Sequence, residues 1–317
     1  LVAVRVASDA LASIGTASFR APIGQEPTWF VYFSATGSIL WQRVLKGAGP
    51  AAGGRATAIV MDANGAATLA GTWVGDCLWE RVDGSGSSLV LQAFATDVEF
   101  TRLFLGRTSA SGSLDVDATF ASSRIGSLSN RVISLHTQST GGNLAVHIVA
   151  GGPMIQDPTG TSIEIVPTPP SGRGYAAVLE FSADRSLGAV YLATGANIRT
   201  TAYRGEALTI VLAQGGSLTR SGVVVVPAPL SDVPITIAQL TGGLIATIAP
   251  FRLGDPAATA LSAAFAFEPD GYGIGLTGNA ANGNAYVTTN PSWTVGADRL
   301  QYVAFLNSRD GLICAER

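Results

Sequence analysis

Apolar residues along this chain come in short runs separated by polar turns. Residues 56–73, ATAIVMDANGAATLAGTW, consist of an apolar run, the turn Asp62-Ala63-Asn64-Gly65 and a second apolar run. Two such runs joined by a short turn containing Asn-Gly are typical of a β-hairpin. No long stretch places apolar residues at the spacing of an amphipathic helix. The pattern therefore predicts an all-β protein.

The hairpin pattern recurs along the chain, and a second type of hairpin alternates with it. Hairpins of the first type cover residues 1–19, 56–73, 131–149, 206–224 and 258–278. Hairpins of the second type cover residues 28–45, 88–105, 174–193, 234–251 and 300–317. The chain thus contains five copies of about four strands each, which is typical of the blades of a β-propeller.

We therefore predict a single five-bladed β-propeller domain, residues 1–317, with approximate blades at 1–50, 51–115, 116–195, 196–253 and 254–317. A β-sandwich would give no reason for five matched copies. An outer-membrane barrel would need a lipid-facing aromatic band, whereas only 8% of the residues are aromatic. Ring closure should bring the strands at residues 2–7 and 312–316 into neighbouring or shared blades, because closure removes an exposed sheet edge.

Two segments depart from the repeat. Residues 107–130 are predicted to form a long loop or an extra edge strand. Residues 154–174 contain Pro167, Pro169 and Pro170, which favours an exposed loop. Loops that depart from a repeat commonly carry binding specificity.

The stretch from residue 29 to residue 73 resembles a known repeat. Its Leu-Trp pair, Gly-rich link and Ala-Ile-x-x-Asp-x-x-Gly hairpin place Trp41, Gly47, Asp62, Gly65 and Gly71 at characteristic spacings. In these features it resembles the bacterial β-propeller repeat family called SBBP. The resemblance implies a propeller fold, usually on extracytoplasmic proteins, and it brings no catalytic residues.

The composition limits the partners of the protein. Charged residues make up 13% of the chain, against about 25% in typical proteins, and the net charge is −3. No basic field is therefore present to attract nucleic acid or anionic lipid. Lys46 is the single lysine, so arginine supplies almost all the positive charge. Much of the surface must be neutral, or be covered by a partner.

The longest nearly uncharged stretch is residues 221–251. It contains Pro227, Pro229, Pro234 and the pair Gly242-Gly243. A membrane-spanning helix needs about 20 apolar residues without such breaks. We therefore expect strands here and no transmembrane segment.

Three carboxylates end the strands predicted to face a central pocket, namely Asp9, Asp62 and Glu268. A glycoside hydrolase needs two carboxylates facing such a pocket. Each of the three lies in a turn, where Asp is a good turn former. We therefore assign them to folding and predict no catalytic residue.

The other chemistry-bearing residues are few. His136 and His147 could approach each other in one hairpin, but two histidines without a further ligand make a poor metal site. The run GIGLTG at residues 273–278 lies in a strand and opens no helix, so it is not a dinucleotide loop. The turns DANG (62–65) and PDGYG (269–273) offer too few oxygen ligands for calcium. We therefore predict no metal and no cofactor.

Tryptophans and cysteines are also assigned to structure. The five tryptophans, four of them in the first two copies, suit core packing better than a ring of sugar-stacking pockets; they are Trp29, Trp41, Trp73, Trp79 and Trp293. Cys77 and Cys314 form no disulfide framework. Because they fall in non-adjacent predicted blades, we expect them not to be bonded to each other.

These observations favour a non-enzymatic structural or protein-interaction scaffold. We expect it to be extracellular, displayed on a cell surface or part of a virion or other particle. Its expected partners are protein neighbours in an assembly, including further copies of itself. A carbohydrate-binding propeller is the main alternative, and a glycoside hydrolase is the third.

Overall fold

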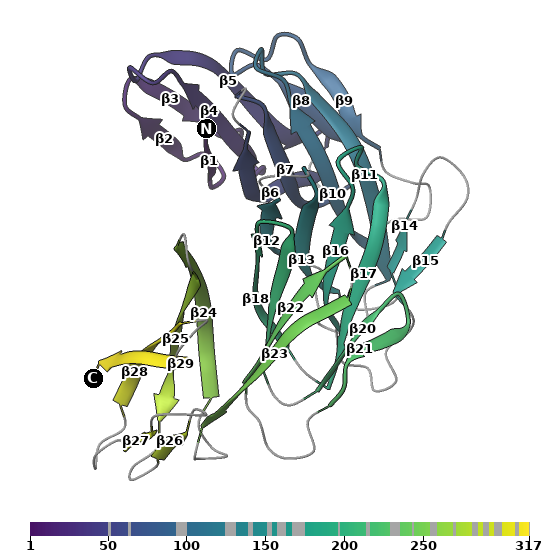
Figure 1. The fold of residues 1–317 in the computed structure, drawn as a ribbon. Helices are drawn as coiled ribbons and strands as arrows, with labels where there is room; N and C mark the ends of the chain where they lie inside the picture. Colours follow the sequence, from purple (N-terminus) through teal and green to yellow (C-terminus); the bar gives the residue numbers. More distant parts are fainter. Residues whose placement is uncertain are drawn as a thin grey trace. The chain divides into compact units, whose positions relative to one another are not determined.

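The protein is all-β, as the alternation of apolar and polar positions predicts. The computed structural model describes residues 1–49, 52–62, 65–92, 100–123, 131–138, 142–150, 154–156, 163–166, 175–195, 197–213, 216–228, 235–242, 244–253, 259–268, 271–280, 285–287, 292–294, 300–307 and 311–316; residues 154–156, 163–166 and the last seven of these ranges are described as backbone only. Within these residues every regular element is a β-strand (Figure 1), and every strand pairing with a defined register is antiparallel. No helix able to span a membrane occurs in this part of the chain.

The strands fall into five successive copies. The first copy has β1 (Val2–Arg5), β2 (Leu11–Ile14), β3 (Ala17–Arg20), β4 (Thr28–Phe33) and β5 (Ile39–Gly47). The second has β6 (Gly53–Met61), β7 (Ala67–Val74), β8 (Cys77–Glu80), β9 (Ser88–Leu91), β10 (Phe100–Thr108) and β11 (Leu114–Ser123). The third has β12 (Arg131–Thr137), β13 (Leu144–Ala150), β14 (Met154–Gln156), β15 (Ile163–Val166), β16 (Tyr175–Phe181) and β17 (Leu187–Thr194).

The last two copies have the same strand order. The fourth has β18 (Asn197–Arg204), β19 (Ala207–Ala213), β20 (Ser217–Arg220), β21 (Val223–Val226), β22 (Ile235–Thr241) and β23 (Leu244–Leu253). The fifth has β24 (Thr259–Glu268), β25 (Gly271–Ala280), β26 (Ala285–Val287), β27 (Ser292–Thr294), β28 (Leu300–Asn307) and β29 (Gly311–Glu316).

Each copy forms a meander of neighbouring antiparallel strands. The meanders are β6-β7-β10-β11, β12-β13-β16-β17, β18-β19-β22-β23 and β24-β25-β28-β29, with β1-β4-β5 in the first copy. Between the second and third strands of each four-stranded meander, and between β1 and β4 in the first copy, the chain makes a short hairpin that we call the crossing hairpin. The crossing hairpins β8-β9, β14-β15, β20-β21 and β26-β27 extend the meander of the preceding copy, and β2-β3 forms a two-stranded sheet. Most sheets therefore take strands from two copies.

The crossing hairpins explain three incorrect predictions. Residues 1–19, 88–105 and 206–224 do not form single hairpins. β1 pairs with β4, β9 with β8, and β19 with β18 and β22. In each case two apolar runs adjacent in sequence belong to different sheets, because a crossing hairpin begins or ends between them. Turn residues mark where a strand ends, but they do not identify its partner.

The two segments that depart from the repeat contain strands. Residues 114–123 form β11, which pairs with β10 on one side and β14 on the other, so it is an interior strand. Residues 154–156 and 163–166 form the crossing hairpin β14-β15. The expected exposed loop is therefore partly a hairpin, while Pro167, Pro169 and Pro170 lie outside the described residues.

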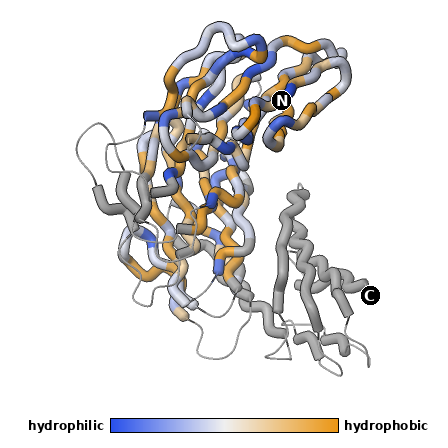
Figure 2. Tube along the Cα trace, turned by 180° about the vertical axis from the view of Figure 1, so that it is seen from behind, coloured by the Kyte–Doolittle hydropathy of each residue, from blue (hydrophilic) through white to orange (hydrophobic). Residues whose placement is uncertain are grey.

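The chain divides into two compact units. Unit 1 comprises Leu1–Leu135 and Ile148–Gly174, and unit 2 comprises His136–His147 and Tyr175–Arg317. The larger core cluster of unit 1 is aromatic, with Phe30, Trp73 and Phe104 among its buried members. The core cluster of unit 2 is mainly aliphatic, with Ile210 and Leu212 fully buried. Figure 2 shows that orange and pale segments outnumber blue ones along the described strands.

One type of turn recurs at the ends of the hairpins. In the turns that start at Ser34, Asp62, Ser109 and Ser182, the backbone N–H of the fourth residue donates to the carbonyl of the first at 2.9–3.3 Å. The fourth residue is Gly37, Gly65, Gly112 or Arg185, with φ between 72° and 83°. Left-handed φ explains the glycines, because a side chain is strained there.

The residues of the 29–73 repeat have structural roles. The Asp62 carboxylate accepts the N–H of Ala66, four residues on, at 2.9 Å. A Cβ added at Gly47 or Gly71 would collide with backbone carbonyls of neighbouring residues. Trp41 is buried. The spacing of these residues thus follows from turn geometry and close strand approach.

The terminal strands belong to different sheets. β1 pairs with β4, and β29 pairs with β28. The two strands therefore do not share one sheet.

Candidate functional site

A cavity of about 390 Å³ lies at the hairpin turns of unit 2. Its wall includes Gln138, Asn143, Glu180, Glu206, Arg220 and Leu240. These residues come from five hairpins of the third and fourth copies, each close to the end of a strand. We call this the Glu180 cavity. Turns from two neighbouring copies build it, so no single sequence segment contains it.

Glu180, near the end of β16, is held by two tyrosines. The hydroxyl of Tyr191 on β17 donates to Oε2 at 3.1 Å, and the hydroxyl of Tyr203 on β18 donates to Oε1 at 2.8 Å. Burial and the neighbouring Glu180 charge raise the pKa of both tyrosines. Both hydroxyls therefore stay protonated and keep the carboxylate in one orientation.

Arg220 and Gln138 bring further polar groups to the wall. The Nε of Arg220 is buried and has no hydrogen-bond partner among the described residues. Gln138 is only 7% exposed, and its Oε1 likewise has no partner there. A buried polar group left without a partner costs about 1–3 kcal/mol. The Arg220 side chain also hydrogen-bonds Tyr191, so the unpaired atoms of these two residues are Arg220 Nε and Gln138 Oε1.

A second cavity, of about 510 Å³, lies in unit 1 at an equivalent place in the first and second copies. We call it the Trp41 cavity. Its wall includes Leu40, Trp41, Arg43, Arg81, Asp83 and Ser111. Trp41 Nε1 donates to Ala110 O at 3.1 Å and Arg43 Nε donates to Gly112 O at 2.8 Å. Trp41 Nε1 and Arg43 Nε are thus both bonded to the turn of residues 109–113.

Arg43 also lies among charges of both signs. Burial and the charge of Arg81 lower its pKa, while the charge of Asp83 acts in the opposite direction. Asp83 itself accepts the N–H of Ser85 at 2.9 Å, and hydrogen bonds from Ser85 lower the pKa of its carboxyl. These charged groups are therefore engaged with one another and with their own turn.

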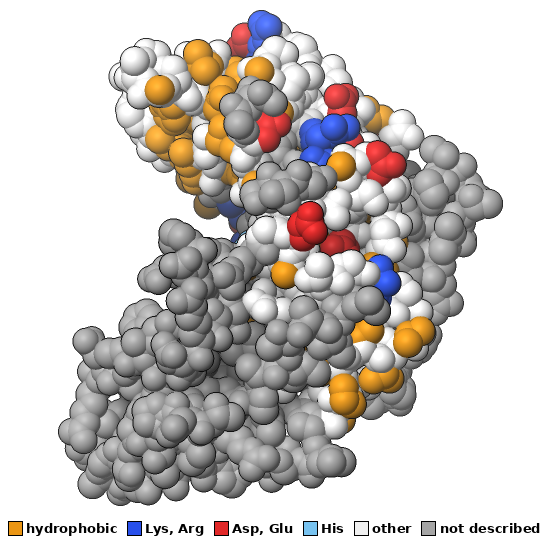
Figure 3. All heavy atoms as spheres, in the orientation of Figure 1, with side chains coloured by type: hydrophobic (Ala, Val, Ile, Leu, Met, Phe, Trp, Pro, Cys, Tyr) orange, Lys and Arg blue, Asp and Glu red, His pale blue; other side chains and the backbone are white. Residues whose placement is uncertain are grey.

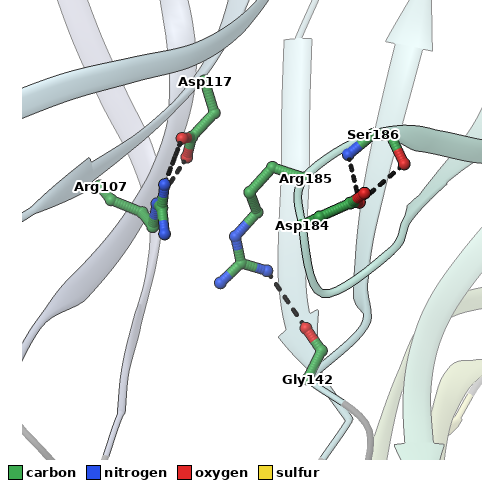
Figure 4. A network of polar contacts seen from close by, with 6 residues as sticks. All are labelled: Arg107, Asp117, Gly142, Asp184, Arg185 and Ser186. Atoms are coloured by element: carbon green, nitrogen blue, oxygen red, sulfur yellow. Dashed lines mark hydrogen bonds and ion pairs between the residues drawn. The ribbon is translucent and has the colours of Figure 1, made fainter.

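Figure 4 shows how the equivalent of Glu180 is used in the second copy. Matching the turns at Ser109 and Ser182 makes Arg107 the counterpart of Glu180. Arg107 Nε and Nη2 both reach the Asp117 carboxylate, at 2.9–3.2 Å. The position is therefore polar in both copies, but in the second copy a cross-strand ion pair uses it.

The turn beside the Glu180 cavity is also drawn in Figure 4. The Asp184 carboxylate accepts both the N–H and the hydroxyl of Ser186, at 3.0 and 2.7 Å, and these bonds lower its pKa. Arg185 Nη1 donates to Gly142 O at 3.2 Å. Arg185 thereby holds the turn that carries Asn143, a residue of the cavity wall.

The carboxylates singled out from the sequence serve turns. Asp9 has φ 58° and accepts Arg20 Nη1 at 2.9 Å. Asp62 accepts the N–H of Ala66. The Glu268 side chain lies outside the described residues. Asp9 and Asp62 are therefore engaged within or beside their own hairpins.

The two histidines influence each other, as their placement in one hairpin predicts. His147 is 1% exposed, and neither ring nitrogen has a partner among the described residues. Burial, with a smaller contribution from His136, lowers the pKa of His147 to about 3. Burial also lowers the pKa of His136. No cluster of three metal-ligating side chains occurs in the part of the chain that the structure describes.

Tryptophan placement agrees with a packing role. Trp29, Trp41, Trp73 and Trp79 are between 0% and 9% exposed, so they are not open stacking platforms. The Trp293 side chain lies outside the described residues. Cys77 is a free, buried thiol whose pKa burial raises to about 12, which makes it unreactive.

The remaining sequence candidates are strand or turn residues. Residues 273–278 lie inside β25, between β24 and β28, and open no helix. Residues 63–64 and 269–270 of the two calcium-like turns lie outside the described residues. Residues 223–226, 235–241 and 244–253 form β21, β22 and β23, which confirms the strands expected between residues 221 and 251.

Sequence reasoning missed the Glu180 cavity. The available signal was a charged residue inside the apolar strand β16, YAAVLEF. No family model, no curated protein and no solved structure matches this chain.

Proposed function

We propose that this chain is a non-enzymatic interaction scaffold with a five-bladed β-propeller fold of the SBBP type. Each meander is one blade, and each crossing hairpin attaches a blade to the preceding one. The observation that carries the proposal is the strand order, which repeats every six strands from β6 to β29. A unit used repeatedly in this way provides a rigid platform for partner binding.

The surface supports a role beside protein neighbours. Figure 3 shows one face of the molecule. On its described part, charged side chains are scattered, with much neutral surface between them. Leu11 (62% exposed), Ile23 (84%) and Val223 (68%) add exposed apolar area. Such a surface suits packing in an assembly on a cell surface, in a virion or in another particle.

The absence of an enzymatic function is part of the proposal. Hydrolysis of a glycoside needs one carboxyl group that donates a proton and a second one across the scissile bond. The wall of the Glu180 cavity contains two carboxylates, but both oxygens of Glu180 already accept tyrosine hydroxyls and Glu206 is exposed in the β18–β19 turn. Asp9 and Asp62 are engaged in turns. Carbohydrate binding, by contrast, is favoured by the unused polar groups of the Glu180 cavity.

Two measurements test the proposal. Electron-microscopy class averages of the purified full chain should show a closed ring of five sheets, and an open array would overturn the propeller. Cross-linking and mass spectrometry on the native source should recover protein neighbours at a constant ratio to the chain. A chain that is recovered free of neighbours and hydrolyses glycosides would overturn the scaffold function.

A further inference from the structure

The Glu180 cavity has the properties of a ligand site independently of the scaffold function. Its volume of about 390 Å³ falls in the range of small-molecule sites, about 300–1,000 Å³. Its walls come from five hairpins, and the Glu180 carboxylate in the wall is held by two buried tyrosines. The site is therefore pre-organised, which lowers the entropy lost on binding.

The polar groups of the wall include both acceptors and donors. Each Glu180 oxygen accepts one tyrosine hydroxyl, and a carboxylate oxygen can accept a second hydrogen bond. The amide oxygen of Gln138 and the Nε of Arg220 are both buried, and neither has a hydrogen-bond partner among the described residues. The matching ligand both donates and accepts hydrogen bonds at closely spaced positions.

The charge of the wall narrows the ligand class. Glu180 and Glu206 oppose the single cation Arg220, so the wall has a net charge of −1. A phosphate, a sulfate or an acidic sugar would face two carboxylates. A neutral molecule with several hydroxyls avoids this repulsion, because each hydroxyl is at once a donor and an acceptor.

We propose that the Glu180 cavity binds a neutral saccharide. Sugar hydroxyls donate to Glu180 and accept from Arg220, while Gln138 and Asn143 contact hydroxyls on the side of the β12–β13 turn. Glu206, exposed in the β18–β19 turn, contacts the outer part of the sugar.

The test uses the full chain and ligand-observed NMR. Saturation transfer is recorded with glucose, galactose, mannose and N-acetylglucosamine, each at millimolar concentration, and with glucuronate as the acidic comparison. At least one neutral sugar should show transfer, and glucuronate should bind more weakly. If none of the neutral sugars binds, the proposed sugar site is wrong. If glucuronate binds best, the proposed preference for a neutral sugar is wrong.

Variants locate the binding. Glu180→Gln should weaken binding of the neutral sugar about tenfold, a loss of about 1.4 kcal/mol. Asp83→Asn makes the same chemical change at the Trp41 cavity and should leave binding within twofold of wild type (roughly 0.4 kcal/mol). Glu206→Gln changes an exposed turn residue and cannot unfold the core, so it decides the question if Glu180→Gln does not fold. Its expected effect is a weakening of about threefold. Unchanged binding in both variants would place the sugar elsewhere.

This experiment separates the two proposals. A failure to detect sugar binding would contradict the sugar site but would not bear on the five-sheet ring or the protein neighbours. An open array in electron microscopy leaves the Glu180 cavity untouched, because the cavity lies within unit 2.

Discussion

The Trp41 cavity of unit 1, about 510 Å³, and the Glu180 cavity of unit 2, about 390 Å³, occupy equivalent places in their copies and differ in how far their polar wall groups are already bonded. Matching the turns at Ser34 and Ser182 makes Leu40 the counterpart of Gly188 and Trp41 the counterpart of Ala189. In unit 1 a large ring contacts the 109–113 turn and bonds to it. In unit 2 small residues leave room beside a carboxylate.

The difference shows how a repeat diversifies without changing its backbone. Both places have the same turn geometry and the same order of strands. In unit 1 the polar atoms of Trp41 and Arg43 bond to the 109–113 turn. In unit 2 Gly188 lies in the wall, and Gln138 Oε1 and Arg220 Nε have no partner among the described residues.

The largest expected effect comes from breaking the packing of the Trp41 cavity. A Cβ at Gly112 would lie 2.9 Å from the Trp41 ring, and φ is +81°. Gly112→Val should cost about 3 kcal/mol, from backbone strain and overpacking together. Gly84→Val is the control, because Gly84 has φ +80° with open space around it and reports strain alone. Denaturant unfolding of both variants measures the difference, and equal losses would contradict the packing role of Trp41.

The second largest expected effect is on the pH dependence of stability, through the buried His147 of unit 2. The folded-state pKa of His147, about 3, lies below its ordinary 6.5, so the unfolded chain binds the proton more strongly between these values. The neutral ring therefore contributes its full stability above pH 6.5. That stability is lost as pH falls toward 3, by about 1.4 kcal/mol per pH unit.

His147→Leu should remove this part of the acid sensitivity. We compare the unfolding free energy of the variant with that of wild type at each pH. This difference should favour the variant by about 2 kcal/mol more at pH 5 than at pH 7. His136→Leu, at the half-buried neighbour, should show a smaller change. Unfolding free energies at both pH values measure the effect. A wild-type and a His147→Leu curve that stay parallel would exclude the histidine as the cause.

The third prediction concerns the turn of residues 182–186. Arg185 has φ 72°, where the equivalent positions in unit 1 are Gly37 and Gly112. Arg185→Gly and Arg185→Ala both lose the bond to Gly142 O, but only alanine keeps the strain. The glycine variant should therefore be more stable than the alanine variant by about 1 kcal/mol. Thermal unfolding compares them, and equal stability would show that the turn relaxes when the arginine is removed.

The smallest stability effect, with a larger effect on binding, comes from enlarging the side chain at Gly188 in the wall of the Glu180 cavity. A Cβ at Gly188 meets Ser182 Oγ at 3.4 Å, an ordinary contact. Gly188→Leu should change stability by no more than about 0.5 kcal/mol while its side chain takes up space in the cavity and weakens sugar binding. Gly188→Ala should keep sugar binding. Binding that survives in the leucine variant would contradict the location of the sugar in this cavity.

The sequence alone determined the fold class and most of the hairpins. Alternating apolar residues and turns such as SATGS and DANG act over a few residues, because side-chain alternation and left-handed φ are local properties. The strands expected between residues 221 and 251, and the buried state of four tryptophans, follow from the same local patterns and from side-chain size.

Only the tertiary structure decided which strands pair and which polar groups meet. The apolar runs of β9 and β10 are adjacent in sequence, yet β9 pairs with β8 of a crossing hairpin and β10 pairs with β7. Glu180, Tyr203 and Arg220 come from three hairpins, and no spacing along the chain relates them. Strand pairing and cavity walls depend on contacts between distant segments, and alternation within one segment carries no information about its distant partner.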